Sequence, residues 1–392
     1  MKRRNGYSLI EVVVAMAILT IVVAGAASAL MQAQNTTNAI SEQANTQQNL
    51  RAGMHFLVRD LMQAGEGIPP AGISIPSTAG GVSAVIRPAI GGAFPGNPTV
   101  LPAVVPGFQW GPAATTVNAQ TGAVLAGGRT DTITIFYADN SLVSSAVCPA
   151  AGAPCPLNSF PVTQAAPAVP VCAGAIAASG LTVTLAPACF TMPGIPTPIQ
   201  AGDLILFHNI NGTALEYVTG VAGQTITFAA GDPAALNQTG LPNGTVASIN
   251  AAATPTVVTR VWMVTYYIDT ATNPLKPRLV RQVNYPGFPV ANPTYPPQQV
   301  ADCIEDINFT YDIINSTAPV GTYPLGPGNA PTPVAPDNSF QIRAVNALIA
   351  GRSEYPLVLN SSRQYFRNNL STQVSIRSLA FVNQFNTSPL GP

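Results

Sequence analysis

The chain has 392 residues, with 16 basic and 16 acidic side chains. This balance excludes a protein whose overall field draws it to a polyanion, so we expect no nucleic-acid partner. Charged residues are 8% of the chain, against about 25% in typical soluble domains, while Pro and Gly number 38 and 33. The composition predicts a neutral, polar surface suited to an exposed extracellular protein.

The start of the chain combines basic residues with a long apolar run. Three basic residues come first: Lys2, Arg3 and Arg4. After Gly6, the run from Leu9 to Met31 carries a single charge, that of Glu11. About 20 apolar residues, each rising roughly 1.5 Å along a helix, cross the hydrocarbon of a bilayer. Residues 9–31 are therefore predicted to span a membrane once, in contact with the lipid bilayer.

Glu11 is the residue in this run that requires an explanation. A carboxylate is unfavourable there, by up to about 3 kcal/mol at the middle of a membrane-spanning helix. Glu11 lies only two residues into the run, so its cost is smaller. A charge inside a membrane-spanning segment marks a candidate functional site and requires a partner.

The residues KRRNG followed by YSLIEVVVAMAIL resemble the class III leader and helix start of type IV prepilins and type II secretion pseudopilins. In that family a membrane aspartyl protease, the prepilin peptidase, cuts after the glycine and methylates the new amino terminus. The resemblance implies a leader over residues 1–6, cleavage between Gly6 and Tyr7, and N-methylation of Tyr7. The family usually has Phe at this position, and Tyr keeps the aromatic ring.

By the same resemblance, Glu11 is the acidic residue five positions into the mature chain. In a filament the helices pack side by side in a medium of low dielectric constant, where an unpaired carboxylate costs several kcal/mol. We therefore expect Glu11 to pair with the new amino group of Tyr7 on a neighbouring subunit and to fix the axial register. The alternative is that Glu11 reaches the lipid headgroups, and both arrangements can hold at different stages.

Two other interpretations of this segment leave Glu11 without a role. An ordinary secretory signal has a shorter apolar core and a cleavage site of small residues after it, for which Ala26–Ala29 is a candidate. A plain signal anchor accounts only for the length of the run and its basic flank.

The helix is expected to continue beyond the membrane, from Tyr7 to Ala64, over about 87 Å. Residues 32–49 are polar and contain neither Pro nor Gly. They are followed by apolar residues at helical spacing, which we expect to pack on a globular head: Leu50, Met54, Leu57, Leu61 and Ala64.

Glycine and proline mark where this helix ends and where it is weak. Gly65, Gly67 and Pro69-Pro70 provide the C-cap and the helix breaker, so the helical segment is placed at residues 7–68. Gly25, Ser28 and residues 35–38 are expected weak points at which the helix bends or melts.

After Pro70, short alternating runs indicate strands between Pro/Gly-rich segments. The expected strands are Thr130–Ala138, Asp203–His208, Leu215–Thr219, Thr225–Ala229, Val257–Asp269, Arg278–Asn284, Asn308–Ile314, Ile342–Ile349 and Gln373–Phe381. Hairpins are expected to join the third of these to the fourth and the fifth to the sixth. Long loops, usually functional or disordered, are expected at 139–180, 231–255, 285–301 and 315–338.

These elements predict an α+β fold in which the long helix packs on an antiparallel β-sheet head, residues 69–392. A head of this size exceeds the ~250–300 residues at which single cores tend to split, so we expect a β-rich insertion at about residues 139–256. Several blocks, among them NLRAGMHFLVRDLMQAG, VVTRVWMVTYYID and STQVSIRSLAF, resemble in their order the PilW-like minor pilins.

Five cysteines indicate an oxidising compartment: Cys148, Cys155, Cys172, Cys189 and Cys303. Proximity in sequence favours the disulfides Cys148–Cys155 and Cys172–Cys189, although four cysteines allow three pairings. The odd count leaves one thiol unpaired or joined to another chain.

No pattern indicates an enzyme, a cofactor or a metal site. Motifs of hydrolases, nucleotide-binding proteins and zinc proteases are absent, and His55 and His208 are expected on polar surfaces. An acidic cluster lacks the spacing of a calcium-binding EF-hand, which favours solvated surface over a calcium site: Asp302, Glu305, Asp306 and Asp312. A thin basic run is likewise expected to be a solvated face: Arg363, Arg367 and Arg377.

The resemblance implies a minor pilin of a type IV pilus, made as an inner-membrane precursor with its head in the periplasm. It would then be incorporated near the filament tip to prime assembly. Its expected partners are the prepilin peptidase, other major and minor pilins, and the inner-membrane assembly platform. A J-like minor pseudopilin of type II secretion shares every N-terminal feature, and a tip adhesin or DNA-uptake pilin is the alternative from the binding class.

Overall fold

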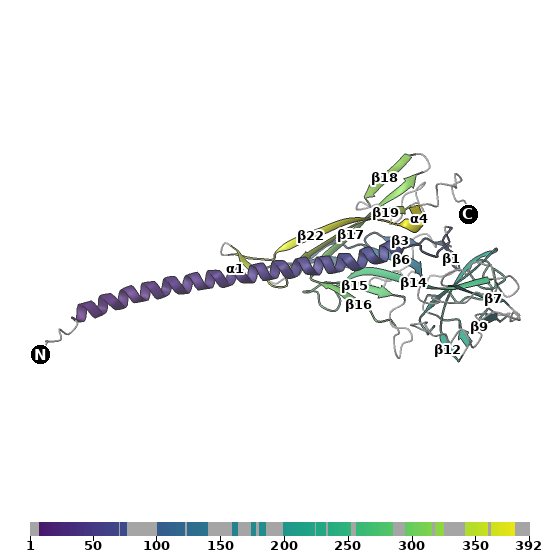
Figure 1. The fold of residues 1–392 in the computed structure, drawn as a ribbon, viewed down its shortest axis with the longest axis horizontal. Coiled ribbons are helices and arrows are strands. Elements are labelled where there is room, and N and C mark those ends of the chain that lie inside the picture. Colours follow the sequence, from purple (N-terminus) through teal and green to yellow (C-terminus); the bar gives the residue numbers. More distant parts are fainter. Residues whose placement is uncertain are drawn as a thin grey trace, which may run out of the picture.

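The computed structural model describes residues 8–69, 71–76, 100–121, 124–139, 159–163, 174–177, 180–185, 199–223, 225–232, 234–251, 256–284, 295–315, 318–324, 342–359 and 362–380. A helix of 55 residues, α1 (Leu9–Gln63), projects from a β-rich head and lies along it with its second half (Figure 1). The expected α+β architecture is confirmed.

Helix α1 runs without interruption through the weak points expected from the sequence. It passes Gly25 and the polar residues 35–38 as regular helix. The hydroxyls of Thr36 and Thr37 each donate to a carbonyl one turn earlier, on Gln32 and Ala33, at 2.9 Å. These bonds give both hydroxyls a partner within the helix.

The end of α1 lies where the glycines predict it. Gly65 and Gly67 have φ angles of +76° and +68°, a region that favours glycine. A Cβ on Gly67 would lie 2.5 Å from the Cβ of Ala138, which leaves no room for a side chain. The amide of Gly65 donates to the carbonyl of Phe136 at 2.8 Å, so the turn after α1 is attached to the neighbouring strand.

A large sheet of twelve strands forms much of the described head. Its strands are β3 (Val104–Gly107), β6 (Thr132–Ala138), β7 (Ser159–Thr163), β8 (Gly174–Ile176), β9 (Thr182–Leu185), β10 (Leu204–Asn209), β11 (Gly212–Tyr217), β12 (Gly220–Ala222), β13 (Thr225–Thr227), β14 (Thr256–Asp269), β15 (Arg278–Val283) and β16 (Gln298–Asp302). The central strand is β14, which pairs with β6, β7, β10 and β15 along its length. The expected hairpin between β14 and β15 is confirmed.

A second sheet of four strands in the described chain has the order β18-β17-β19-β22. Its strands are β17 (Ile304–Asn315), β18 (Ala318–Pro324), β19 (Ile342–Arg352) and β22 (Arg367–Ser375), after which comes the short helix α4 (Arg377–Ala380). Three two-stranded sheets complete the described strands: β1 (Ile73–Ser74) with β2 (Val100–Leu101), β4 (Ala113–Val117) with β5 (Val124–Arg129), and β20 (Leu357–Leu359) with β21 (Ser362–Gln364).

The expected hairpin between Leu215–Thr219 and Thr225–Ala229 is wrong. Strand β11 pairs with β10 through a tight turn, and β12 forms the hairpin with β13. Gly212, with a φ of +138°, allows the tighter β10–β11 turn. Three of the four residues expected as a loop, Gly220–Ala222, therefore form a strand of their own.

The expected strand Gln373–Phe381 is also wrong at both ends. Strand β22 begins earlier, at Arg367, and residues 377–380 are helical. Ile376 is fully buried, and the side chain of Leu379 would lie 3.3 Å from a Cβ on Gly65. The chain turns here because both apolar side chains pack against the end of α1.

Several segments that were expected to be loops contain strands. Within 139–180 lie β7 and β8, β16 overlaps 285–301, and β18 lies within 315–338. These strands lack clean apolar alternation, and pairing with neighbouring strands defines them. The described part of 231–255 has no strand.

One hydrophobic cluster joins α1 to both sheets. Leu50, Met54, Leu57, Leu61 and Ala64 are all buried in it, which confirms the predicted stripe. In the described residues, α1 contacts β16 of the large sheet and both β19 and β22 of the small one. The helix is thus part of the core of the head over its last four turns.

Shortening a side chain of the stripe tests this attachment. Leu57 is fully buried, so Leu57→Ala leaves a cavity and should lower the free energy of unfolding by about 2–5 kcal/mol. Denaturant unfolding of the full chain in detergent measures the loss. Met62→Ala, at a side chain that is 47% exposed, is the control and should change stability by less than about 0.5 kcal/mol. Equal effects of the two substitutions would contradict the assigned packing.

Candidate functional site: the amino-terminal helix and its attachment to the head

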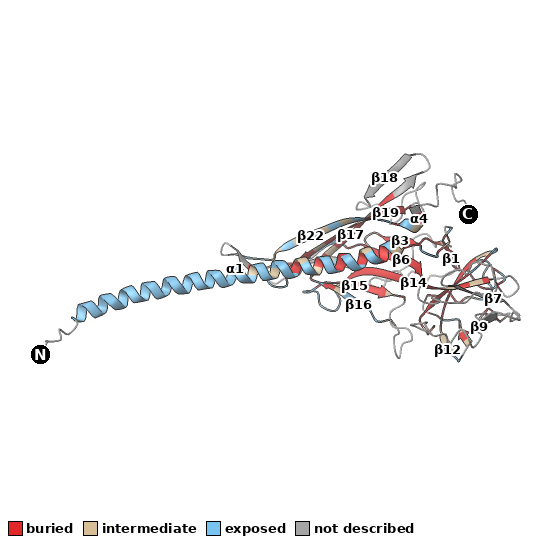
Figure 2. Ribbon diagram, viewed as in Figure 1, coloured by how far each residue is buried: buried red, intermediate tan, exposed pale blue. Residues whose placement is uncertain are grey.

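The first half of α1 exposes its apolar side chains. Leu9 and Ile21 are 82% and 72% exposed, and no residue of the most apolar 18-residue window of the helix is buried. Figure 2 shows this half as a continuous exposed rod and the second half as a helix with one buried face. Among the described residues, α1 is the one helix long and apolar enough to cross a membrane. Water is an unfavourable medium for such a surface, so the segment requires lipid or other protein around it.

Glu11 lies in the first turn of this exposed segment. Its Oε2 accepts a hydrogen bond from the backbone amide of Ser8, the N-cap residue, at 2.9 Å. A carboxylate at this place satisfies a free amide and interacts favourably with the helix dipole. The basic residues of the start, Gly6 and Tyr7 all lie outside the described residues. The carboxylate of Glu11 is therefore bound to the amide of Ser8, the residue that follows Tyr7 in the sequence.

The buried half of α1 approaches the head closely at a glycine. A Cβ on Gly53 would lie 3.1 Å from Leu279 Cδ2 and 3.3 Å from the Cβ of Ala301. The absence of a side chain at Gly53 lets the helix lie directly on β15 and β16. Leu50 before it and Met54 after it are buried in the hydrophobic cluster of the head.

A buried ion pair fixes the rotation of α1 against the head. Asp60 is 1% exposed, and its Oδ2 accepts hydrogen bonds from Arg281 Nε at 2.6 Å and from the Tyr266 hydroxyl at 2.7 Å. Arg281 also donates to the hydroxyl of Tyr137 at 3.4 Å. Asp60 belongs to α1, whereas its partners belong to β14 and β15, so this cluster joins three elements that are distant in the sequence.

Burial and the nearby carboxylate of Asp60 keep both tyrosines protonated. Burial is the larger cause, and together the two raise the pKa of Tyr137 to about 12. They also raise the pKa of Tyr266 well above its ordinary value. The Tyr266 hydroxyl therefore stays a donor to Asp60 at every physiological pH. A buried charge without its partner is strongly destabilising, so any rotation of α1 that separates Asp60 from Arg281 is disfavoured.

A second contact attaches α1 at the opposite end of the head. Glu42 Oε2 accepts a hydrogen bond from the backbone amide of Glu354 at 3.1 Å. About two turns beyond it, Leu50 packs where Gly351 has no side chain, 3.2 Å from the position of an added Cβ. The helix is thus held from Glu42 to Asp60 and is free of the described head before that.

A separate buried network lies on β14 and joins it to the residue after β6 and to the residue before β10. Arg260 is fully buried; its Nε donates to Asp139 Oδ2 at 2.6 Å and its Nη1 to Asp203 Oδ2 at 3.3 Å. The hydroxyl of Tyr295 also donates to Asp203. Burial raises the pKa of Asp203 above its ordinary value, although Arg260 acts against this. The network thus holds Asp139 and Asp203, which are far apart in the sequence, against the same residue of β14.

Other residues singled out from the sequence have structural environments. His55 and His208 are exposed, as expected. The solvated surface expected for the acidic cluster is wrong for two of its members, because Glu305 and Asp312 are buried at 6% and 8% exposure. Glu305 is paired with Arg352 at 3.1 Å and with Arg367 at 2.8 Å. No group of residues suited to holding a metal ion occurs in the described parts of the chain.

The cysteines are only partly described. Cys148, Cys155, Cys172 and Cys189 all lie outside the described residues, so their expected disulfides stay a prediction. Cys303 is a free, buried thiol between β16 and β17. Burial raises its pKa above the ordinary value, which favours the unreactive thiol over the thiolate.

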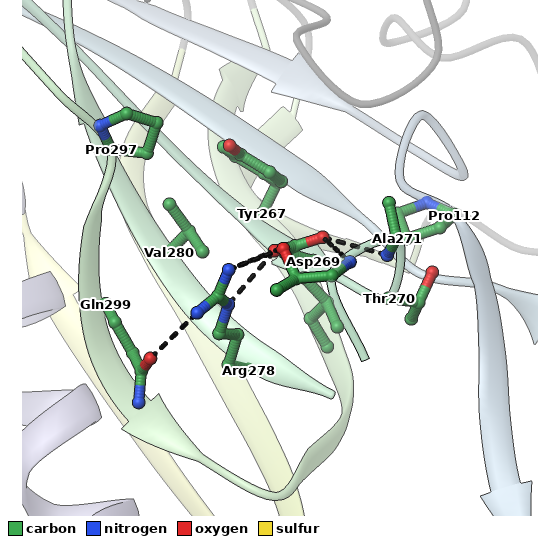
Figure 3. A pocket seen from close by; sticks show the side chains of 11 residues that line it. Pro112, Tyr267, Asp269, Thr270, Ala271, Arg278, Val280, Pro297 and Gln299 are labelled. Carbon is green, nitrogen blue, oxygen red and sulfur yellow. Dashed lines mark hydrogen bonds and ion pairs between the residues drawn. The ribbon is translucent and has the colours of Figure 1, made fainter. Parts of the chain in front are cut away.

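A pocket of about 330 Å³ lies beside the turn between β14 and β15 (Figure 3). Asp269 accepts hydrogen bonds there from Arg278 at 2.9 Å and from the amide of Ala271 at 2.8 Å. Arg278 donates to Gln299 at 3.1 Å as well. These charges are satisfied within the chain, so the cluster stabilises the hairpin and its neighbour β16.

Sequence reasoning missed Asp60 and Arg260, although a signal for each is present. Asp60 lies three residues after Leu57 and one before Leu61, a spacing that puts it on the apolar face of the helix. Arg260 interrupts the apolar run VVTRVWM. A charge at a position that the pattern assigns to the core indicates a buried ion pair.

The comparisons with known proteins concern the start of the chain. Residues 1–27, which include Gly6, Tyr7 and Glu11, match a family described as the prokaryotic N-terminal methylation motif. No curated protein and no solved structure matches the chain. The match supports a type IV pilin-like protein: a structural subunit with a membrane anchor, processed by a prepilin peptidase and assembled with other pilins.

Removing Asp60 tests the ion pair that joins α1 to the head. Asp60→Ala leaves Arg281 buried without its carboxylate, and we expect a loss of about 3–5 kcal/mol in the free energy of unfolding. Arg59→Ala is the matched control, since Arg59 is exposed and lies 3.6 Å from the same carboxylate; its loss should stay below about 1 kcal/mol.

The double variant Asp60→Leu/Arg281→Met separates the charge from the packing. Replacing both partners by apolar residues should recover most of the stability that Asp60→Ala loses. Denaturant unfolding of all four proteins provides the comparison. If Asp60→Ala were as stable as Arg59→Ala, the pair would not hold the helix.

Proposed function

We propose that this protein is a minor pilin of a type IV pilus, incorporated through α1 near the filament tip, where it primes assembly with other pilins. The observation that carries the proposal is the division of one continuous helix. Its second half is part of the core of the head, while its first half exposes an apolar surface long enough to cross a bilayer. A subunit of this form moves from lipid into a bundle of like helices without refolding its head.

Processing precedes assembly in this proposal. The basic residues Lys2, Arg3 and Arg4 keep the leader on the cytoplasmic side, so the head is in the periplasm. The prepilin peptidase cuts between Gly6 and Tyr7 and methylates the amino group of Tyr7. The protein then leaves the inner membrane through the assembly platform and joins the filament at the cell surface.

Glu11 has two partners at two stages. In the single chain its carboxylate binds the amide of Ser8, which lowers the cost of its place near the membrane surface. In the filament the amino group of Tyr7 on a neighbouring subunit replaces that partner and neutralises the charge in the helix bundle. The exchange fixes the axial register, since a shift by even one turn separates the two groups.

Features of the head favour the proposal of a minor pilin near the filament tip. A hydrophobic cluster separate from the one that buries α1 includes Phe207 and Phe228 and is formed within residues 176–258. We propose that residues 139–256 are an inserted lobe with this core. Added bulk on one side of a head fits the end of a filament better than a shaft position enclosed by neighbours. A J-like pseudopilin of type II secretion has the same helix, but the neutral, Pro/Gly-rich head favours an extracellular position.

Substitution of Glu11 tests the proposed assembly step. Glu11→Ala should be cut by the peptidase as the parent is, yet its amount in sheared filaments should fall at least tenfold, because an unpaired amino group in the helix bundle costs more than about 1.4 kcal/mol. Immunoblots of the membrane and filament fractions measure both quantities. Arg51→Gln, a change at an exposed position of the same helix beyond the membrane span, is the control for incorporation.

Two outcomes would contradict this account. Equal incorporation of Glu11→Ala and the parent would remove the pairing of Glu11 with Tyr7. Loss of a secreted protein with filaments intact, on deletion of the whole gene, would favour the type II secretion system over the pilus.

A further inference from the structure

A pocket of about 440 Å³ on the head has a lining of amides, arginines and a tyrosine. One wall is the turn after β4, with Asn118 and Gln120, and the other is the segment from β21 to β22, with Arg363, Tyr365 and Arg367. Apart from the two arginines, the described lining residues are uncharged, and none of them carries a carboxylate. Gln120 donates to the carbonyl of Arg363 at 2.9 Å and joins the two walls.

The pocket lies at the end of the head that is nearest to the membrane-spanning segment. Arg367 is directly opposite Arg352 in the pairing of β22 with β19, and two residues after Arg352 the amide of Glu354 binds Glu42 of α1. The other end of β22 leads to Leu379, next to Gly65 at the far end of α1. In Figure 1 this places the start of β22 at the end of the head from which the free half of the helix emerges.

Helix geometry brings this end close to a bilayer. Met31 and Glu42 are separated by about 16 Å along α1 at 1.5 Å per residue. Headgroups occupy roughly 5–7 Å of that distance on each side of the hydrocarbon. The remaining gap is about the length of an arginine side chain, or about one Debye length of 8 Å at physiological ionic strength. A phosphate at the membrane surface therefore acts on cations at this end of the head.

The two arginines have different environments in the pocket. Arg367 is held by the buried Glu305, to which its Nε donates at 2.8 Å. The guanidinium of Arg363 is exposed, and it has neither an ion pair nor a hydrogen bond among the described residues. An exposed carboxylate on this end, that of Glu354, is already paired with Lys276. Arg363 is thus a positive charge with unused donors beside an uncharged polar surface.

Two exposed side chains at the same end suit an interface between water and lipid. Tyr355 and Leu275 are 60% and 48% exposed. The ring of Tyr355 lies 5.7 Å from Lys276 Nζ, and the carbonyl of Leu275 accepts a hydrogen bond from Arg352. Tyrosine and basic residues are enriched at membrane surfaces, where an apolar body and a polar tip are both satisfied.

We propose that the pocket formed by Asn118, Gln120, Arg363, Tyr365 and Arg367 binds the phosphate of an anionic phospholipid headgroup while the protein is in the membrane. The contact holds the head close to the bilayer before assembly and is broken when the helix is withdrawn. It rests on the part of the proposed function that makes α1 a membrane anchor. It does not depend on incorporation into a filament.

Hydrogen exchange of the full chain in vesicles tests the proposal. With phosphatidylglycerol in the vesicles, exchange of the amides of β20 and β21 should be about fivefold slower than in phosphatidylcholine alone, because one arginine at an anionic surface contributes an effect of that size. High ionic strength should abolish the difference. Arg363→Gln should abolish it too, whereas Arg377→Gln, an exposed arginine at the opposite end of the head, should retain it.

Each other outcome overturns the proposal. Equal exchange in both vesicles, or a difference that persists in Arg363→Gln, would show that the pocket does not bind the headgroup. If inorganic phosphate added to phosphatidylcholine vesicles produced the same slowing, the ligand would be a soluble anion instead. Alkaline extraction of the protein from the vesicles tests the membrane anchor separately, so failure of the anchor and failure of the pocket are distinguishable.

Discussion

The buried ion pair between Asp60 and Arg281 is the interaction on which the arrangement of this molecule depends. It joins a helix at the start of the chain to a strand more than two hundred residues later. Both charges lie in the core, where either one alone is strongly destabilising. The helix therefore has one rotation and one depth relative to the head. Gly53, which lets the backbones approach, and the apolar stripe agree with that same position.

A fixed second half makes the first half of the helix a rigid extension of the head. Because α1 is unbroken from Leu9 to Gln63, movement of the apolar half along its axis moves the head with it. The fold provides no cover for that half within the described chain. Lipid and a bundle of similar helices are the two environments that satisfy it, and Glu11 is the group whose partner has to change between them. The same rigidity sets the distance between the membrane surface and the end of the head that carries Arg363.

The sequence allowed the helix to be predicted well, because its signals are local. The spacing of Leu50, Met54, Leu57 and Leu61 identified the buried face, and Gly65 and Gly67 identified the end. The β14–β15 hairpin followed from two clear apolar runs separated by a turn. In these cases the pattern and the tertiary structure impose the same requirement on the same residues.

The remainder depended on contacts between distant segments, which local patterns do not report. Asp60 and Arg281, or Arg260 and its two carboxylates, find each other only after the sheets form. Glu305 and Asp312 were expected in solvent because they lie in an acidic run, yet pairing within the four-stranded sheet buries them. Strands β7, β8 and β18 occur in Pro/Gly-rich segments where neighbouring strands provide the hydrogen bonds.

The account requires that the mature chain begins at the residue after Gly6. Mass spectrometry of the native polypeptide isolated from cells measures this directly. We predict a chain that starts at Tyr7 and carries one methyl group on its amino nitrogen. A chain that still starts at Met1, with its leader uncut and its amine unmodified, would contradict the account and leave a head tethered to the membrane by a simple anchor.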